Sequence, residues 1–236
     1  MGDTFTEIIE KLSKDISKNN TSLCIGTFDG VHSGHKKLFN KLIRVSKDNN
    51  SLAVVFVFKI RPREIINIKS SKPYILPFKN RANKIKDSNI EKIIEIDFDK
   101  KLQVLSSEEF LKILKEKINL RSLITSVNTR IGKDQINGNK LQTVCKNLNI
   151  DFHQIDMTSD NEKIISSSNI SSLIDGGKIE EANSMLGENF YFSGRVIEGD
   201  RLGRTIGFPT ANLFVKKNQQ VPGDGIFVST VEIENK

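Results

Sequence analysis

The stretch 24–35, Cys-Ile-Gly-Thr-Phe-Asp-Gly-Val-His-Ser-Gly-His, combines glycines and two histidines at a spacing that can bind phosphate. It follows a short apolar run, and the residues of 36–47 then repeat with helical spacing. A glycine-rich turn between a strand and a helix presents free backbone N–H groups and the positive end of the helix dipole. His32 and His35 lie one helical turn apart, so both imidazoles can donate hydrogen bonds to the phosphate oxygens of one ligand. The turn therefore predicts a site for the phosphates of a nucleotide.

Two other interpretations of the histidines remain open on the residues alone. A histidine at the start of a helix is often a surface or capping residue, and two imidazoles at this spacing can also hold a metal ion. The metal interpretation has little support, because the one further histidine, His153, and the two cysteines, Cys24 and Cys145, are scattered along the chain. Cys24 stands in the apolar run, where a small buried thiol is the usual outcome.

The charge of the chain gives no reason to expect a nucleic-acid partner. The 236 residues include 36 Lys and Arg against 29 Asp and Glu, a formal net charge of +7. A basic surface suits anionic partners in general. However, lysine, isoleucine and asparagine are frequent throughout, tryptophan is absent, and no basic run reaches the length of a nucleic-acid-binding arm.

The composition also argues against a membrane or secreted location. No segment approaches the ~20 apolar residues needed to cross a bilayer, so we expect no membrane partner. Residues 1–17 are amphipathic and lack the apolar block and cleavage site of a secretory signal. Two scattered cysteines form no disulfide framework and suit a reducing compartment. The sequence predicts a cytoplasmic protein and leaves its oligomeric state open.

Strand-like apolar runs alternate with helical patterns over the first two thirds of the chain. Strands are expected at 23–27, 52–58, 93–98, 123–127 and 150–155, and helices at 36–47, 80–88, 108–117 and 139–147. This alternation indicates an α/β fold with a parallel sheet covered by helices on both faces. Ligands of such sheets bind at the carboxyl ends of the strands, where the loops 28–34, 59–79 and 128–138 are expected.

The pattern changes after residue 156. Ser166, Ser167 and Ser168 stand at an expected helix start, and a further short helix is expected at 178–186. From 187 onward, β-like runs at 191–196, 207–214 and 226–233 are separated by glycines. We therefore expect two domains, 1–186 and 187–236. The domain 187–236 is too small to bury a robust core alone, so the sequence is expected to end within this domain. The domain 1–186 is expected to act without it.

Four motifs occur in a fixed order along the chain. They are Gly26-Thr-Phe28-Asp29-Gly30-Val-His32-Ser-Gly34-His35, Asn128-Thr-Arg130-Ile-Gly132, Ile165-Ser-Ser-Ser168, and a stretch from Gly194 that ends in Gly207-Phe-Pro-Thr210-Ala-Asn212. Together they resemble the motifs of the bacterial bifunctional riboflavin kinase/FMN adenylyltransferases, also called FAD synthetases. The first and last motifs are highly specific, and the resemblance covers the whole chain.

The resemblance implies a Rossmann-like nucleotidyltransferase domain with a parallel sheet, followed by a partial β-barrel riboflavin kinase-like domain. In the first domain, the phosphate of FMN would attack the α-phosphorus of ATP and release pyrophosphate, giving FAD. The implied catalytic residues are His32, His35 and Asn128. The implied binding residues are Gly26, Phe28, Asp29, Gly34, Arg130, Ser166, Ser167 and Ser168 in the first domain, and Gly199, Arg204, Thr210 and Asn212 in the second. Mg²⁺ would accompany ATP, with Thr210 and Asn212 as its ligands in the second domain, and ATP, FMN and riboflavin would be the small-molecule partners.

The chain departs from the family pattern at several positions. Many relatives carry Asp-Pro-His-Pro where 59–62 reads Lys-Ile-Arg-Pro, and the hypothesis is that Arg61 or Arg63 supplies a replacement positive charge. Ser171 stands where an arginine is usual, and Ser126 stands where a glycine is usual before the central motif. These departures motivate the alternative of a flavin- or nucleotide-binding protein without catalysis. Because the chain ends before a carboxylate that relatives are thought to use, kinase activity is not expected.

Overall fold

The centre of the molecule is a five-stranded parallel sheet. The computed structural model describes residues 4–16, 19–66, 72–157, 164–200, 202–205 and 207–233. The strands are β1 (Asn20–Gly26), β2 (Ser51–Phe58), β3 (Lys92–Ile96), β4 (Leu120–Ser126) and β5 (Asp151–Ile155), in the spatial order β3-β2-β1-β4-β5. Every neighbouring pair in this sheet is parallel. The predicted α/β fold with a parallel sheet is confirmed, and each of the five strands predicted before residue 156 overlaps an observed one.

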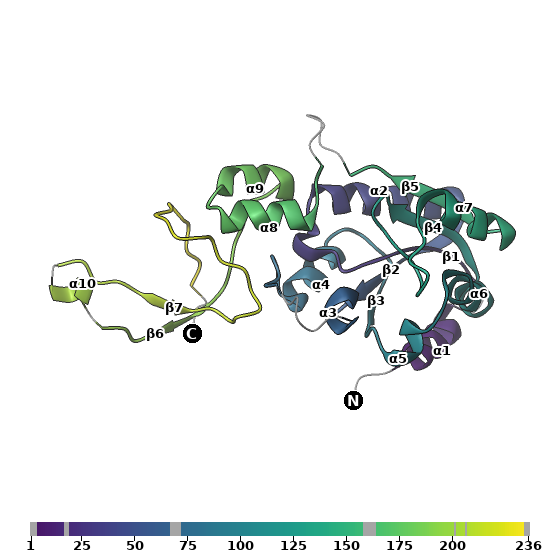
Figure 1. Cartoon of the computed structure of the whole chain (residues 1–236), viewed down its shortest axis with the longest axis horizontal. Coiled ribbons are helices and arrows are strands. Elements are labelled where there is room, and N and C mark those ends of the chain that lie inside the picture. Colours follow the sequence, from purple (N-terminus) through teal and green to yellow (C-terminus); the bar gives the residue numbers. More distant parts are fainter. Residues whose placement is uncertain are drawn as a thin grey trace.

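Helices lie on both sides of the sheet (Figure 1). They are α1 (Phe5–Ile16), α2 (Ser33–Asp48), α3 (Pro62–Ile66), α4 (Phe78–Lys86), α5 (Lys100–Gln103), α6 (Ser107–Ile118) and α7 (Gly138–Asn147), with a short 3₁₀ turn, η1 (Asp29–Val31), before α2. The four helices predicted in this region correspond to α2, α4, α6 and α7. The expected helices did not include α1, although its segment was recognised as amphipathic. They also did not include α3 and α5, which are too short to show a helical period.

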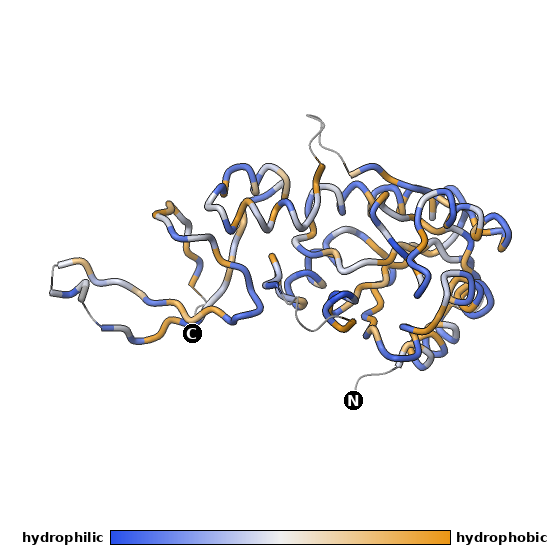
Figure 2. The backbone as a smooth tube through the Cα atoms, viewed as in Figure 1, coloured by the Kyte–Doolittle hydropathy of each residue, from blue (hydrophilic) through white to orange (hydrophobic). Residues whose placement is uncertain are grey.

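Alternate residues of the strands pack against different sets of helices. Val54 and Phe56 of β2 contact the cluster formed with α1 and α6, whereas Val55 and Val57 contact the cluster formed with α2 and α4. Both faces of the strand are therefore buried, which explains why it reads as one continuous apolar run. Figure 2 shows apolar residues along the strands of this layered part and further apolar stretches along the C-terminal part.

Two further helices connect the sheet to the C-terminal part of the chain. They are α8 (Ser167–Asp175) and α9 (Ile179–Leu186), and they form a third apolar cluster with Ile75 and Leu76. The helix α9 ends at Gly187, which adopts the left-handed conformation, with φ of 72°. Such a glycine is a common helix terminator. The helix α9 thus ends where the sequence predicts a domain boundary.

The C-terminal part extends away from the sheet (Figure 1). It holds α10 (Leu202–Thr205) and the short strands β6 (Arg195–Ile197) and β7 (Asn212–Phe214), which pair antiparallel. The β-like pattern at 226–233 does not correspond to a strand. Ile226 and Val228 are fully exposed there, and an extended segment needs a neighbouring strand to become regular β-structure. In the part of the chain that the structure describes, no helix is long and apolar enough to cross a membrane.

Candidate nucleotide-binding site

A cavity lies at the point where the order of the strands reverses. From β1 the chain continues through β2 and β3 on one side of the sheet, and β4 and β5 follow on the other. Ligands of such doubly wound sheets bind at the carboxyl ends of the strands at this reversal. A cavity of about 480 Å³ lies there, lined by residues that follow β1 and β4 and by the start of α8. The volume falls within the range of small-molecule sites.

The predicted first-domain site residues are brought together here. Ten of them line the cavity: Gly26, Phe28, Asp29, His32, His35, Asn128, Arg130, Ser166, Ser167 and Ser168. Gly34 does not line it, but a Cβ at Gly34 would lie 2.9 Å from Cε of Met157. Met157 itself lines the cavity, so Gly34 permits its close packing. The second-domain residues Gly199, Arg204, Thr210 and Asn212 lie elsewhere, in the part that contains β6 and β7.

The turn that carries the histidines has a strained backbone. Phe28 and Val31 adopt positive φ angles of 52° and 45°, which side chains with a Cβ rarely take. Valine is especially unsuited to this conformation because it is β-branched. Such strain persists only where surrounding contacts enforce it, and it concentrates at functional sites. The turn is therefore held in place by the rest of the structure.

The two imidazoles form a stacked pair. Their ring centroids lie 3.6 Å apart with an interplanar angle of 19°, and the edge of His35 meets Phe28 at 5.3 Å. His32 is buried, and neither Nδ1 has a hydrogen-bond partner among the described residues. Burial lowers the pKa of His32 to about 4. Burial, the neighbouring His32 and the charge of Arg81 together lower the pKa of His35 well below its usual range. Both rings are therefore neutral at pH 7 and can serve as hydrogen-bond donors without a full charge.

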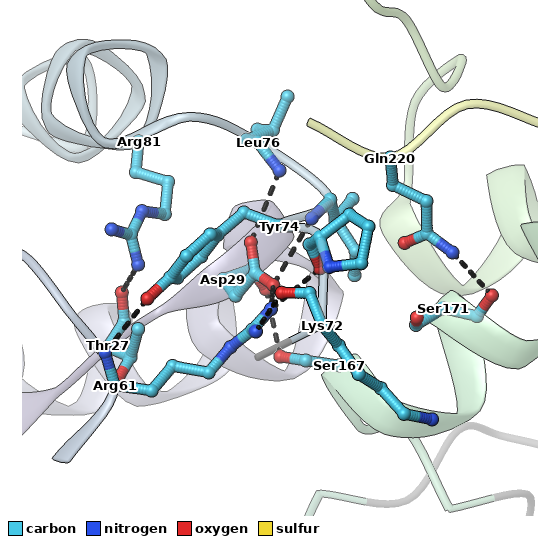
Figure 3. Close-up of polar contacts among 12 residues, drawn as sticks. Thr27, Asp29, Arg61, Lys72, Tyr74, Leu76, Arg81, Ser167, Ser171 and Gln220 are labelled. Carbon is cyan, nitrogen blue, oxygen red and sulfur yellow. Dashed lines mark hydrogen bonds and ion pairs between the residues drawn. The ribbon is translucent and has the colours of Figure 1, made fainter. Parts of the chain in front are cut away.

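The carboxylate of Asp29 accepts three hydrogen bonds from within the protein (Figure 3). Its Oδ2 accepts hydrogen bonds from Nη2 of Arg61 at 2.6 Å and from the backbone N–H of Ile75 at 3.2 Å, and its Oδ1 accepts one from Leu76 at 3.2 Å. The side chain is 3% exposed. Asp29 thus ties the histidine turn to the segment before α4.

Arg61 is bound almost entirely within the protein. Beside Asp29, its guanidinium donates to Glu64 at 2.6 Å and to the carbonyl oxygens of Lys72 and Pro73, and it lies 3.9 Å from the ring centroid of Tyr74. Burial opposes the charged form, but the carboxylates of Asp29 and Glu64 outweigh it and raise the pKa of Arg61. With its charge balanced by two carboxylates, Arg61 is poorly placed to bind phosphate.

Arg63 remains the better candidate for the replacement charge. It lies on α3, is exposed and lines the cavity. Among the described residues, no ion pair compensates it in the way that Asp29 and Glu64 compensate Arg61.

The serine cluster is joined directly to the histidine turn. The Oγ of Ser167 donates a hydrogen bond of 2.9 Å to the backbone oxygen of Asp29. Ser166 caps α8 by accepting from the N–H of Asn169 at 3.2 Å, which confirms the predicted helix start. Ser168 is exposed at the cavity. The positive end of the α8 dipole and the imidazoles therefore face the same space.

The loop after β4 completes the polar side. Asn128 and Arg130 are exposed at the cavity. The loop is fastened to the start of α6, because Asp134 accepts hydrogen bonds of 2.8 Å from both the N–H and the Oγ of Ser107. Gly132 has φ of 74°, and a Cβ there would lie 2.2 Å from the nitrogen of Ser107. Glycine is therefore required where this loop meets α6.

Sequence reasoning missed two sets of site residues. Arg81 is completely buried, and its guanidinium donates to the carbonyl oxygens of Thr27 at 2.8 Å and Lys59 at 2.7 Å, which ties together the ends of β1 and β2. An arginine on a helical pattern carries no sequence signal for such a role.

The cavity also has an apolar recess, formed by Phe58, Phe98, Leu102, Leu105, Phe110 and Ile131. These residues are indistinguishable in sequence from ordinary core residues.

The fold and the site together define the class of protein. A doubly wound parallel sheet with a phosphate-binding turn at the reversal of strand order is the architecture of α/β nucleotide-binding domains. Residues 14–169 match the FAD synthetase family, and residues 186–236 match the riboflavin kinase family. The chain belongs to the bifunctional riboflavin kinase/FMN adenylyltransferase family, which confirms the resemblance found in its motifs.

Individual relatives support this assignment. The bifunctional riboflavin kinase/FMN adenylyltransferase of Buchnera aphidicola subsp. Schizaphis graminum (strain Sg) is 38% identical over 204 residues, covering 85% of this chain and 65% of that protein. The one from Bacillus subtilis (strain 168) is 27% identical over 217 residues, covering 91% and 68%. A crystal structure described as a macrolide-efflux protein from Streptococcus pneumoniae has a TM-score of 0.77 at 27% identity, covering 90% of this chain and 70% of that one. The chain spans about two thirds of the length of the curated relatives it matches.

The lowered pKa of His32 predicts a loss of stability on acidification. Histidines of the unfolded chain take up protons below about pH 6.5, whereas His32 in the fold stays neutral down to about pH 4. The unfolded state therefore binds more protons between these values, and stability falls as the pH falls. Between pH 6.5 and 5 we expect His32 alone to reduce the free energy of unfolding by about 2 kcal/mol.

Urea unfolding at pH 7 and pH 5 measures this effect. His32→Gln should lose less stability than the wild type over this interval, whereas His153→Gln, on β5 outside the cavity, should retain most of the wild-type loss. Equal losses in the wild type and His32→Gln would contradict the prediction.

Proposed function

We propose that residues 1–186 transfer the adenylyl group of ATP to FMN, giving FAD and pyrophosphate. The observation that carries this proposal is the composition of one cavity. Its polar side is formed by the histidine turn, the start of α8 and the loop after β4, and its other side is apolar. A triphosphate suits the first side, and the flat apolar ring system of a flavin suits the second.

The chemistry requires alignment and charge stabilisation more than acid–base work. An oxygen of the FMN phosphate attacks the α-phosphorus of ATP, and the bond from that phosphorus to the oxygen bridging to the β-phosphate breaks. We propose that His32 and His35 donate hydrogen bonds to the charge that develops on the phosphates, with the dipole of α8 adding to them. The hydroxyl of Ser168 and the amide of Asn128 would orient the reacting groups, which lowers the barrier by fixing their positions.

Mg²⁺ enters this proposal together with ATP. Among the described residues, no group of three His, Cys, Asp or Glu side chains could hold a metal ion. The carboxylate that lines the cavity, Asp29, is already occupied by Arg61 and two backbone N–H groups. This fits a magnesium ion held mainly by phosphate oxygens and water, as is common for this cation. Bound Mg²⁺ would neutralise part of the triphosphate charge.

A non-catalytic binding protein is the second candidate function. It is favoured by the neutralised charge of Arg61 and by Ser171, whose hydroxyl cannot grip a phosphate as an arginine does. Incubating the full chain with FMN, ATP and Mg²⁺, with chromatographic detection of FAD, separates the two. FAD formation that stops on chelation of Mg²⁺ supports adenylyl transfer. Binding of ATP without turnover supports the alternative.

The second domain carries a separate proposal. We propose that residues 187–236 are the opening of a β-barrel riboflavin kinase unit in which Thr210 and Asn212 offer oxygen atoms to MgATP. Contacts bring Gly199 against Asn212 and Gly203 against Thr210. Apolar side chains such as Phe208 and Val228 are exposed rather than gathered around a cavity, so we expect riboflavin phosphorylation by this chain to be weak or absent.

A cytoplasmic location is part of the proposal. Both cysteines, Cys24 and Cys145, are free and buried, which is compatible with a reducing compartment.

Replacing the buried histidine should impair the adenylyl transfer step. We expect His32→Ala to lower kcat for FAD formation by about two orders of magnitude, the scale of losing one preorganised donor to a transition state. His153→Ala serves as the matched control and should keep the wild-type rate. A folded His32→Ala variant with unchanged kcat would remove His32 from the mechanism.

The apolar recess should decide the affinity for the flavin. Leu105 lines it, whereas the adjacent Val104 is 62% exposed and lies outside it. We expect Leu105→Gln to raise the KM for FMN about tenfold, the order of magnitude for losing the burial of one leucine side chain. The KM for ATP should stay within twofold, and Val104→Gln should change neither constant. Equal effects of Leu105→Gln on both KM values would place the flavin elsewhere.

A further inference from the structure

Residues 218–223 of the C-terminal part return to the first domain. The backbone N–H of Tyr74 donates to the oxygen of Asn218, and the N–H of Gln220 donates to the oxygen of Tyr74, both at 2.8 Å. The side-chain Nε2 of Gln220 donates to the backbone oxygen of Ser171 at 2.7 Å (Figure 3). The same nitrogen also donates to Oδ1 of Asp175 at 2.8 Å. One short segment therefore contacts both the segment around Tyr74 and the helix α8.

This contact is built into the structure. Gln219 and Gln220 are only 5% and 2% exposed, although most side chains around them in the C-terminal part are exposed. Burying an amide is costly unless it is hydrogen-bonded, and the Nε2 of Gln220 donates to two acceptors on α8. The Oε1 of Gln220 and the Nε2 of Gln219 are buried without a hydrogen-bond partner among the described residues, so the Nε2 of Gln220 makes the side-chain hydrogen bonds of this contact. The N–H of Gly223 also donates to Ile174, and a Cβ at Gly223 would lie 2.1 Å from the backbone oxygen of Asp175. Only a glycine permits this approach.

The first path from this contact to the cavity runs through Tyr74. The ring of Tyr74 stacks on the guanidinium of Arg61, and its hydroxyl accepts from the N–H of Arg61 and donates to Glu64, both at 2.9 Å. Arg61 in turn pairs with Asp29. The backbone N–H groups of the two residues that follow Tyr74 donate to the same carboxylate. A displacement of Tyr74 is therefore transmitted to the histidine turn.

The second path runs along α8. Gln220 holds Ser171 and Asp175 in the second half of this nine-residue helix, while the serine cluster at its start faces the cavity. The helix is about 13 Å long, so Gln220 contacts it within two to three turns of the serine cluster. The Oγ of Ser167 donates to the backbone oxygen of Asp29, so the two paths meet at the same residue.

We propose that the segment 218–223 is a positioning element of the adenylyl transfer site, with Gln220 as its anchor. It holds α8 and the Tyr74 segment together, so that the serine cluster and the histidine turn face the same phosphates. This inference rests on the proposed function. It replaces the sequence-based expectation that residues 1–186 act independently of the rest.

The test uses the full chain with Gln220→Ala, which removes both side-chain hydrogen bonds and leaves those of the backbone. We expect the KM for ATP to rise about tenfold, within the usual range of coupling between sites, and kcat to stay within twofold. Gln142→Ala, at an exposed glutamine of α7 outside the cavity, is the chemically matched control and should leave both constants unchanged. A purely structural role of Gln220 would instead reduce the fraction of active protein, lowering kcat without changing the KM.

Hydrogen exchange provides a readout that does not require turnover. In Gln220→Ala, the amides of α8 and of Ile75 and Leu76 should exchange faster, while those of α6 should not change. Unchanged exchange together with an unchanged KM for ATP would overturn the proposal. If the wild type forms no FAD, the proposed function fails by itself. The role of the segment 218–223 is then tested by hydrogen exchange and by the affinity for α,β-methylene-ATP. A variant that binds this analogue as tightly as the wild type and exchanges at the same rate would refute it.

Discussion

The buried carboxylate of Asp29 is the interaction on which the geometry of the site depends. A buried carboxylate is strongly unfavourable unless it is paired and hydrogen-bonded. Here the donors are the guanidinium of Arg61 and the backbone N–H groups of Ile75 and Leu76, all on a segment remote in sequence from the turn. The backbone oxygen of the same residue accepts from Ser167. Four contacts thus enforce the left-handed backbone of the histidine turn, which would otherwise relax.

If the cavity binds phosphate as proposed, the buried donors at the histidine turn and at the start of α8 would act on it through dipoles rather than full charges. The stacked imidazoles are neutral because burial disfavours their protonation, and the start of α8 contributes the partial charge of a helix end. The full charge of Arg61 is cancelled by Asp29 and Glu64, and the exposed Arg63 and Arg130 lie at the cavity. Fixed donors in a buried position need little reorganisation when charge develops on a ligand, which suits transition-state stabilisation better than tight binding of the ground state.

The sequence alone predicts the parts of this structure that depend on local patterns. The five strands follow from continuous apolar runs, and the histidine turn and the start of α8 follow from glycine spacing and a hydroxyl cap. Contacts between distant segments leave no such pattern. The pairing of Arg61 with Asp29, the burial of Arg81 and the docking of Gln220 are decided by how elements pack, so no window of the sequence reveals them. The expected strand at 226–233 failed for the same reason, since an apolar run becomes a strand only beside a partner.

Two of the departures from the family motifs, at Arg61 and Ser171, lie on one connected set of contacts. At Arg61, where the family resemblance implies a histidine, the charge is balanced by Asp29 and Glu64, so Arg61 stabilises the turn without adding charge to the cavity. At Ser171, where the resemblance implies an arginine, the backbone oxygen accepts a hydrogen bond from Gln220. Both positions therefore serve the architecture around Asp29 in this chain. The same segment, 218–223, contacts Tyr74 beneath Arg61 and the backbone of Ser171, which links the two departures to the docking of the C-terminal part.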